Sequence, residues 1–109
     1  MPECFGKSFM EHFEIKIFPT AMQDLEDIVN YLNTLSSEAA IKYYDKLVNE
    51  IESLSVFPER NPKPRDLLLA AKGYRYLIVE NYLVFYVVSA NVVQIRRILY
   101  AKRDYSRLL

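Results

Sequence analysis

The arginines are the residues of this chain best suited to chemistry. All of them lie in the second half of the 109 residues, and Arg75, Arg97 and Arg103 fall on or just after segments with strand-like composition. A guanidinium is always charged and can donate two parallel hydrogen bonds to a phosphate. We therefore predict that Arg75, Arg97 and Arg103 serve an anion site, although surface arginines also commonly form salt bridges with acidic side chains.

An anion site that cleaves RNA also needs a general acid and a general base. Tyr100 and Tyr105 are the catalytic candidates, and each needs a nearby Arg or Lys to lower a pKa that starts near 10. Lys102, Arg96 and Tyr82 are candidates for binding RNA or another target, because cations bind phosphate and aromatic rings stack on bases. We interpret the lone histidine, His12, as a solvated residue, and no metal-ligand cluster or cofactor motif is found.

Side-chain alternation along residues 92–100 places a constraint on these candidates. In a regular strand, Arg97 shares a face with Ile95 and Leu99, whereas Arg96 shares the other face with Ile98 and Tyr100. Arg97 and Tyr100 then point to opposite faces unless a β-bulge intervenes near the strand end. We therefore favour Arg75 and Arg103 over Arg97 as site residues, with Arg96 as its substitute.

Charge and composition limit the class of protein. The net charge is zero, but residues 1–56 sum to −6 and residues 57–109 to +6, so the basic half is suited to an anionic partner. A simpler alternative is that one acidic element is compensated elsewhere. The single cysteine, Cys4, fits a reducing cytoplasm, and neither a signal peptide nor a membrane helix is expected.

Hydrophobic periodicity predicts one domain of class α+β. Residues 1–12 form an N-terminal tail and residues 13–109 the domain. Its expected order is β-α-α-β-β-β, a small antiparallel sheet with a helical hairpin packed on one face. The first helix is expected to open with a capping box at Thr20 and Gln23. The predicted elements are strand Phe13–Phe18, helices Thr20–Leu35 and Glu38–Ser55, a loop at Phe57–Arg65, an ambiguous stretch Asp66–Lys72, and strands Tyr74–Val79, Tyr82–Val88 and Val92–Tyr100.

The middle predicted strand is apolar on both faces, with Leu83, Phe85 and Val87 on one and Tyr82, Val84, Tyr86 and Val88 on the other. A helical hairpin covers only one face of a sheet, and large exposed apolar patches usually mark contacts. We therefore expect a partner chain or a tyrosine-lined cleft at the second face. The alternative is that the tail or Asp66–Lys72 folds over it.

Four segments together resemble the RelE/ParE toxin family, and most closely its ParE-like branch. They are DLEDIVNYL (Asp24–Leu32), SSEAAIKYYDKLVNEIESLSVFPE (Ser36–Glu59), GYRYLIVENYLVFYVV (Gly73–Val88) and VVQIRRILYAKRDYSRLL (Val92–Leu109). The resemblance implies a growth-inhibiting toxin that a cognate antitoxin neutralises, and family members place catalytic arginines at positions matching Arg75, Arg97 and Arg103. This sequence departs from the nuclease pattern at Tyr100, where a histidine is frequent, and at Leu83, where many relatives carry arginine.

Three functions are compatible with this resemblance. The chain is a ribosome-dependent, metal-independent mRNA endonuclease, a non-enzymatic inhibitor of DNA gyrase, or a degenerate toxin that acts as co-repressor with its antitoxin. The expected partner is an acidic antitoxin that is partly disordered when free, in a toxin–antitoxin hetero-oligomer, with ribosome and mRNA or DNA gyrase as the target. No membrane partner is expected.

Overall fold

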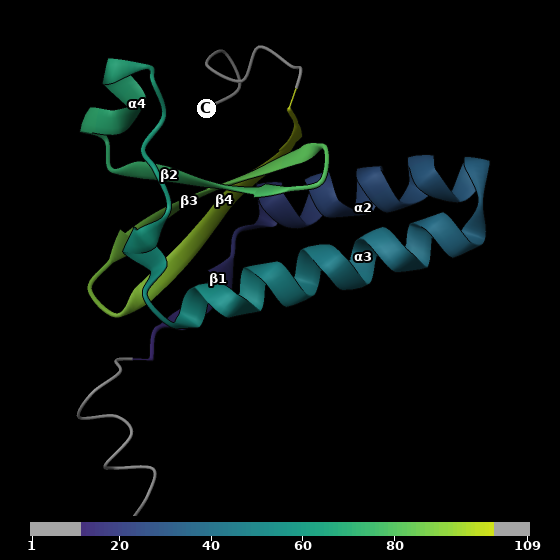
Figure 1. Ribbon diagram of the computed structural model, residues 1–109, viewed down its shortest axis with the longest axis horizontal. Helices are drawn as coiled ribbons and strands as arrows, with labels where there is room; N and C mark the ends of the chain where they lie inside the picture. The colour runs from purple at the N-terminus through teal and green to yellow at the C-terminus, as the bar shows by residue number, and fades with distance from the viewer. Residues whose placement is uncertain (1–11, 102–109) are drawn as a thin grey trace, which may run out of the picture.

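The computed structural model describes residues 12–101, which form a four-stranded sheet with a helical hairpin (Figure 1). The predicted site residues Lys102, Arg103 and Tyr105, and most of the predicted tail, lie outside these described residues. The elements in chain order are β1 (Glu14–Ile17), α2 (Pro19–Leu35), α3 (Ser37–Glu52), η1 (Ser53–Ser55), η2 (Pro58–Arg60), α4 (Leu67–Ala71), β2 (Tyr74–Val79), β3 (Tyr82–Ser89) and β4 (Val92–Tyr100).

Each long helix begins where its local sequence permits. α2 begins at Pro19, whose fixed φ suits the first helical position and whose missing N–H costs nothing there. Thr20 therefore lies inside the helix, so the predicted capping box is wrong; the residue before the helix, Phe18, makes no side-chain cap. The start of α3 is capped as expected, because Ser36 Oγ accepts a hydrogen bond from the Ala39 N–H at 3.3 Å.

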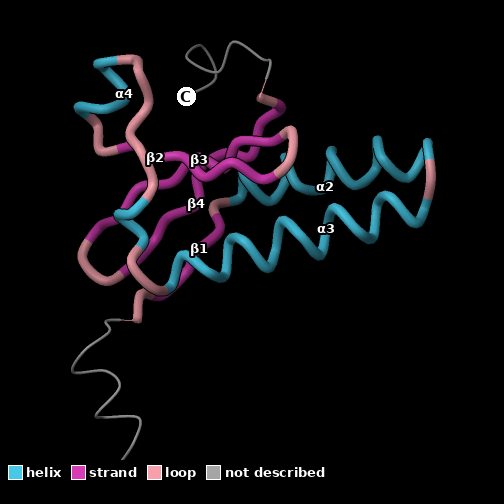
Figure 2. The backbone as a smooth tube through the Cα atoms, in the orientation of Figure 1, coloured by secondary structure: helices cyan, strands magenta, loops and turns pink. Residues whose placement is uncertain are grey.

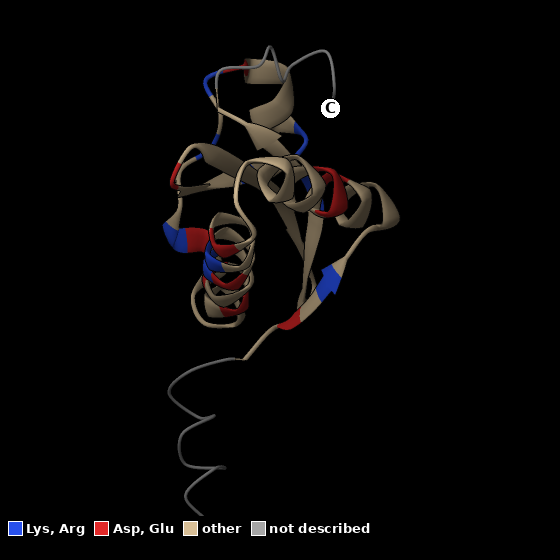
Figure 3. Ribbon diagram, turned by 90° about the vertical axis from the view of Figure 1, so that its right-hand side faces the viewer, with Lys and Arg blue, Asp and Glu red and all other residues tan. Residues whose placement is uncertain are grey.

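The two helices run antiparallel and pack on one face of the sheet, as predicted (Figures 1 and 2). In the view turned by 90°, the helices of the hairpin are seen nearly end on (Figure 3). The core between the layers is almost entirely apolar and includes Leu25, Leu47, Ile51, Val84 and Ile95, each at most 5% exposed. The α+β class and the hairpin on the sheet are confirmed.

The sheet order is β1-β4-β3-β2, and it is mixed rather than wholly antiparallel. The meander β2–β3–β4 is antiparallel as expected, but β1 pairs in parallel with β4, with Glu14 opposite Val92 and Ile17 opposite Ile95. A parallel pair needs a long connection, and here the whole hairpin and meander supply it. The sequence pattern identified the strand but contained no signal for its direction.

The second face of the sheet is covered in part by the chain itself. Leu69 of α4 packs with Leu83 and Phe85 of the middle strand and with Leu99 of β4. Asp66 caps the short helix α4 by accepting hydrogen bonds from the N–H groups of Leu68 and Leu69. The predicted division of the middle strand between two faces is confirmed. At Leu83 and Phe85 the second face is covered by the chain's own 66–72 segment, and not by the expected partner chain or tyrosine-lined cleft.

The loop after η1 is fastened to the sheet by polar contacts. The Tyr86 hydroxyl donates to the Pro58 carbonyl and accepts from Asn61 Nδ2 at 3.1 Å. The Tyr76 N–H donates to the Pro62 carbonyl at 3.2 Å, so the loop runs along the outer edge of β2. These contacts satisfy an edge that would otherwise be open to strand addition. Among residues 12–101, none of the helices has the length and apolarity needed to cross a bilayer.

Candidate functional site

Arg75 lies on the edge strand β2 and contacts the loop. Its guanidinium donates to the Asn61 carbonyl at 2.8 Å. In the register Arg75 stands opposite Tyr86, whose side chain belongs to the core beneath the hairpin. Arg75 therefore helps to hold the loop at residues 58–62 in place, and its charge lies on the helix-covered side of the sheet.

Arg97 lies on β4 and forms an ion pair with α2. Its Nε and Nη2 atoms donate to the two carboxylate oxygens of Asp24 at 2.7 and 2.9 Å, and the same carboxylate accepts from the Ile98 N–H at 3.0 Å. The pairing of β1 with β4 ends at Ile95, so no residue of β1 accepts a hydrogen bond from the Ile98 N–H. The Asp24 carboxylate accepts it instead. The Arg97 and Asp24 side chains are 20% and 11% exposed, and the hydrogen bond from Arg97 to Asp24 is the main cause that raises the pKa of Arg97 above its usual value.

A β-bulge in β4 decides where Arg96 and Arg97 point. Phe85 stands opposite Arg97 while the next residue, Tyr86, stands opposite Ile95, so Arg96 is the extra residue. The bulge lies in the middle of the strand rather than near its end. Arg97 and Tyr100 consequently remain on opposite faces, as predicted, but the grouping of Arg97 with Ile95 is wrong.

Arg96 lies at an aromatic corner formed by β1, β2 and β4. Its guanidinium lies 4.7 Å from the centre of the Phe18 ring and 5.9 Å from that of Tyr74. It also donates to Gln94 Oε1 at 2.9 Å. The expected grouping of Arg96 with Ile98 is wrong as well, because Ile98 belongs to the core under the hairpin.

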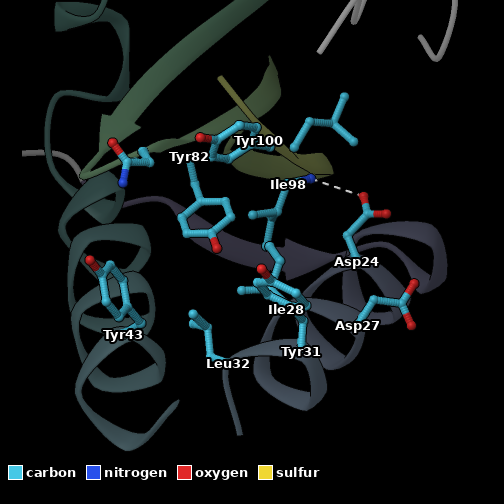
Figure 4. A pocket seen from close by; sticks show the side chains of 11 residues that line it. Asp24, Asp27, Ile28, Tyr31, Leu32, Tyr43, Tyr82, Ile98 and Tyr100 are labelled. Carbon is cyan, nitrogen blue, oxygen red and sulfur yellow. Dashed lines mark hydrogen bonds between the residues drawn. The ribbon is translucent and has the colours of Figure 1, made fainter. Parts of the chain in front are cut away.

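The predicted tyrosines Tyr82 and Tyr100 meet in a pocket between the hairpin and the strand ends of the sheet. Their ring centres are 6.0 Å apart, and Tyr43 of α3 meets Tyr82 edge-on at 6.2 Å. The pocket has a volume of about 580 Å³ (Figure 4). It is lined by Asp24, Asp27, Ile28, Tyr31, Leu32, Tyr43, Asn81, Tyr82, Ile98, Leu99 and Tyr100.

This pocket keeps its buried tyrosine neutral. Burial is the largest cause that raises the pKa of Tyr82 above 10.0, followed by the neighbouring phenols of Tyr43, Tyr100 and Tyr31. Among the described residues, no Lys, Arg or His lines the pocket to lower this pKa. A tyrosine that is to serve as a general base needs the opposite environment.

The predicted site residues are therefore only partly brought together. Tyr82 and Tyr100 share the pocket, Arg97 and Arg96 lie towards the second face, and Arg75 is held by the loop. Within residues 12–101 no group of His, Cys, Asp or Glu is placed to hold a metal ion. Asp24, Tyr31 and Tyr43 were not predicted as site residues, because the helices were expected only to cover the sheet. Their spacing along α2 and α3 was the sequence pattern that could have indicated a shared surface.

The fold and this arrangement define a small α+β domain in which the helical hairpin and the end of the meander enclose an aromatic, acidic pocket. Comparison with known families gives its class. The family model described as "ParE toxin of type II toxin-antitoxin system, parDE" matches residues 15–105, so the chain belongs to the ParE toxin family. The sequence resemblance is thereby confirmed, and the chain is a toxin of the type II class.

A solved structure is similar in fold. It is titled "Chromosomal ParDE TA system from P. aeruginosa", and one of its chains superimposes with a TM-score of 0.72 at 22% sequence identity. The match covers 84% of this chain and 99% of that chain. No curated protein sequence matches this chain.

Proposed function

We propose that this toxin arrests growth by binding a protein target, with DNA gyrase as the first candidate, and not by cleaving mRNA. The main support is the distance in the fold between Arg75 and Arg97, the two arginines predicted as catalytic that lie within residues 12–101. By strand register Arg75 and Arg97 lie on opposite faces of the sheet. Stabilising one scissile phosphate requires cations that converge on it, together with an acid and a base within hydrogen-bonding reach.

Both arginines also make hydrogen bonds that hold parts of the fold together. Arg75 binds the Asn61 carbonyl and Arg97 binds Asp24 through two hydrogen bonds. Turning Arg75 towards a substrate would break its contact with the Asn61 carbonyl. Turning Arg97 towards a substrate would leave the Asp24 carboxylate, only 11% exposed, without its ion pair. The tyrosine that is buried here, Tyr82, has its pKa raised, which disfavours its use as a base. These features support a binding surface over a nuclease site.

We also propose that a cognate antitoxin holds the toxin inactive. The second half of the chain carries a net charge of +6, which suits an acidic antitoxin segment that is partly disordered when free. Membership of the ParE toxin family supports such a partner. The resulting assembly is a toxin–antitoxin hetero-oligomer.

The test is controlled expression of the full chain in a bacterial host, followed by parallel measurement of plasmid topology and of mRNA 5′ ends. Gyrase inhibition should relax negatively supercoiled plasmid and leave the mRNA ends unchanged. Expression of the Arg103→Ala variant distinguishes the alternatives further. New mRNA ends that disappear in this variant would instead establish an endonuclease, and a chain that causes no growth arrest would point to the co-repressor role.

The predicted toxic surface is tested by the same assay. Arg75→Ala, Arg103→Ala and the double variant are compared for growth arrest, with thermal melts to check folding. If all three variants stay folded and fully toxic, the arginines do not form the toxic surface. We would then assign toxicity to the helical hairpin and the pocket beside it.

A further inference from the structure

The pocket between the hairpin and the strand ends is open to solvent and is lined by aromatic and acidic side chains. Four tyrosines contribute to its lining, one from each of α2, α3, β3 and β4. Tyr31 is 62% exposed and Tyr100 is 41% exposed, whereas Tyr82 between them is 8% exposed. Burying aromatic rings is favourable, so large rings left open to solvent around a hollow suggest a surface kept for a ligand.

The arrangement of the rings suits a cation. Tyr82 meets Tyr43 and Tyr100 edge-on, with centre-to-centre distances of 6.2 and 6.0 Å. Figure 4 shows Tyr43, Tyr82 and Tyr100 on the same side of the pocket as Leu32, with Tyr31 next to Ile28; all of these residues line the pocket. Several aromatic faces around one space attract an ammonium or guanidinium group through the ring quadrupoles.

The charged side chains around the pocket also favour a cationic ligand. Asp24 and Asp27 stand on its α2 side, and none of the lining residues within 12–101 is basic. Arg97 compensates Asp24, but the structure gives Asp27 only the hydrogen bond from Gln23 at 2.9 Å. Because the pKa of Tyr82 is raised, the buried phenol is neutral at physiological pH and presents a ring face rather than a phenolate.

We propose that this pocket binds an arginine or lysine side chain of the toxin's protein target. The aliphatic part of such a side chain packs on Ile28 and Leu32, its cationic group lies against the tyrosine rings, and Asp27 at the rim supplies the compensating charge. The size of the pocket, about 580 Å³, accommodates one long side chain together with part of its backbone.

The target, and not the antitoxin, is the expected source of the cation. The antitoxin is expected to be acidic and to complement the basic second half of the chain, whereas the pocket takes both its carboxylates and two of its tyrosines from the acidic first half. Opposite charge selects different partners for the two surfaces. This assignment of the partner rests on the proposed function; the preference of the pocket for a cationic side chain does not.

The binding test uses the full chain and defined probes. N-acetyl-arginine amide and N-acetyl-lysine amide are titrated while the NMR signals of the tyrosine rings are followed, with N-acetyl-norleucine amide as the uncharged control. We expect both cationic probes to shift the signals of Tyr31, Tyr43, Tyr82 and Tyr100, and the norleucine probe to bind at least about threefold more weakly. Equal binding of the three probes overturns the proposal, as does the absence of shifts at these tyrosines.

Matched variants separate the contributions of the Asp27 charge and the Tyr31 ring to binding of the cationic probes. Asp27→Asn should weaken the cationic probes about twofold to fivefold, as expected for one partly screened charge, and Tyr31→Ala should do so by a similar factor. Glu26→Gln and Tyr44→Ala are the controls, because both side chains lie on the hairpin but line a different groove. If the controls weaken binding as much as the pocket variants, the cation is held by the general charge of the hairpin and the proposal is wrong. A dissociation constant for spermidine about tenfold below that of either amide, with the same pocket signals shifted, would assign the site to a free polyamine instead.

Growth assays identify the partner. Asp27→Asn and Tyr31→Ala should reduce growth arrest while neutralisation by the antitoxin encoded beside the toxin is retained. Full toxicity together with weakened neutralisation would make the antitoxin the partner and overturn the assignment to the target. Probe binding that persists when plasmid topology proves unaffected would refute only the gyrase proposal, so the two failures are distinguishable.

Discussion

The ion pair between Asp24 and Arg97 joins the first helix to the last strand, and its removal should destabilise the domain strongly. In Asp24→Ala the guanidinium of Arg97 loses two charge-assisted hydrogen bonds and the Ile98 N–H loses its acceptor. Breaking a buried pair by removing one partner typically costs about 3–5 kcal/mol. Because Arg97 keeps 20% exposure and can gain water, we expect about 2–4 kcal/mol here.

A domain of this size loses about 4 °C or more of melting temperature for each kcal/mol, so Asp24→Ala should melt about 8–16 °C lower. Asp24→Asn retains an acceptor for the Ile98 N–H and loses the charge, and should fall between the wild type and Asp24→Ala. Urea denaturation of Asp24→Ala, Arg97→Ala and the double variant gives the coupling energy, for which we expect roughly 1.5–3 kcal/mol. A coupling below about 0.5 kcal/mol would show that the contact contributes no more than an exposed surface pair.

Three further predictions concern the core, the loop and the pH dependence. Leu47→Asp should unfold the domain, because Leu47 is 0% exposed between the helices and the sheet, whereas Ile41→Asp at a 64% exposed position of the same helix should melt like the wild type in circular dichroism. Tyr86→Phe should cost about 1–2 kcal/mol in urea denaturation, since the Pro58 carbonyl loses its buried donor; an unchanged midpoint would argue against anchoring of the loop by this hydroxyl. Since the pKa of Tyr82 is raised in the folded state, its contribution to stability is complete below pH 10.0 and is lost as the pH rises through the higher folded value. The loss of stability between about pH 8 and about pH 11 should therefore be smaller in Tyr82→Phe, and equal losses in both proteins would contradict this.

The elements of the fold were predictable because their signals are local. Hydrophobic spacing of 3 and 4 residues along 21–35 and 40–54, and alternation along 74–100, identified the hairpin and the meander. The parallel pairing of β1 with β4 was not predictable in this way. It depends on contacts between residues about 78 positions apart, such as Glu14 and Val92, which no local pattern encodes.

The candidate site was predicted only in part, for two physical reasons. One extra residue, Arg96, shifts the alternation of β4 and moves Arg97 away from the face that a regular strand would give it. In addition, the acidic partner of Arg97 is Asp24, which lies on the polar side of a helix 73 residues earlier in the sequence. No local sequence pattern around Asp24 predicts this pairing. Tyr82 and Tyr100 were identified by type, but the pocket they share also needs Tyr31 and Tyr43 from the hairpin.

The parallel pairing of β1 also determines the order in which the domain can be completed. The contacts between α2 and α3 join neighbouring segments of the chain, whereas β1 must wait for β4, the last described strand, before it acquires a neighbour. Asp24 likewise waits for Arg97 and the Ile98 N–H, and the tyrosine pocket for Tyr82 and Tyr100. A partly synthesised chain that lacks β4 therefore has no finished binding surface. Toxicity that depends on the pocket begins only after β4 has left the ribosome, which leaves an interval during translation in which an antitoxin can meet the chain before it is harmful.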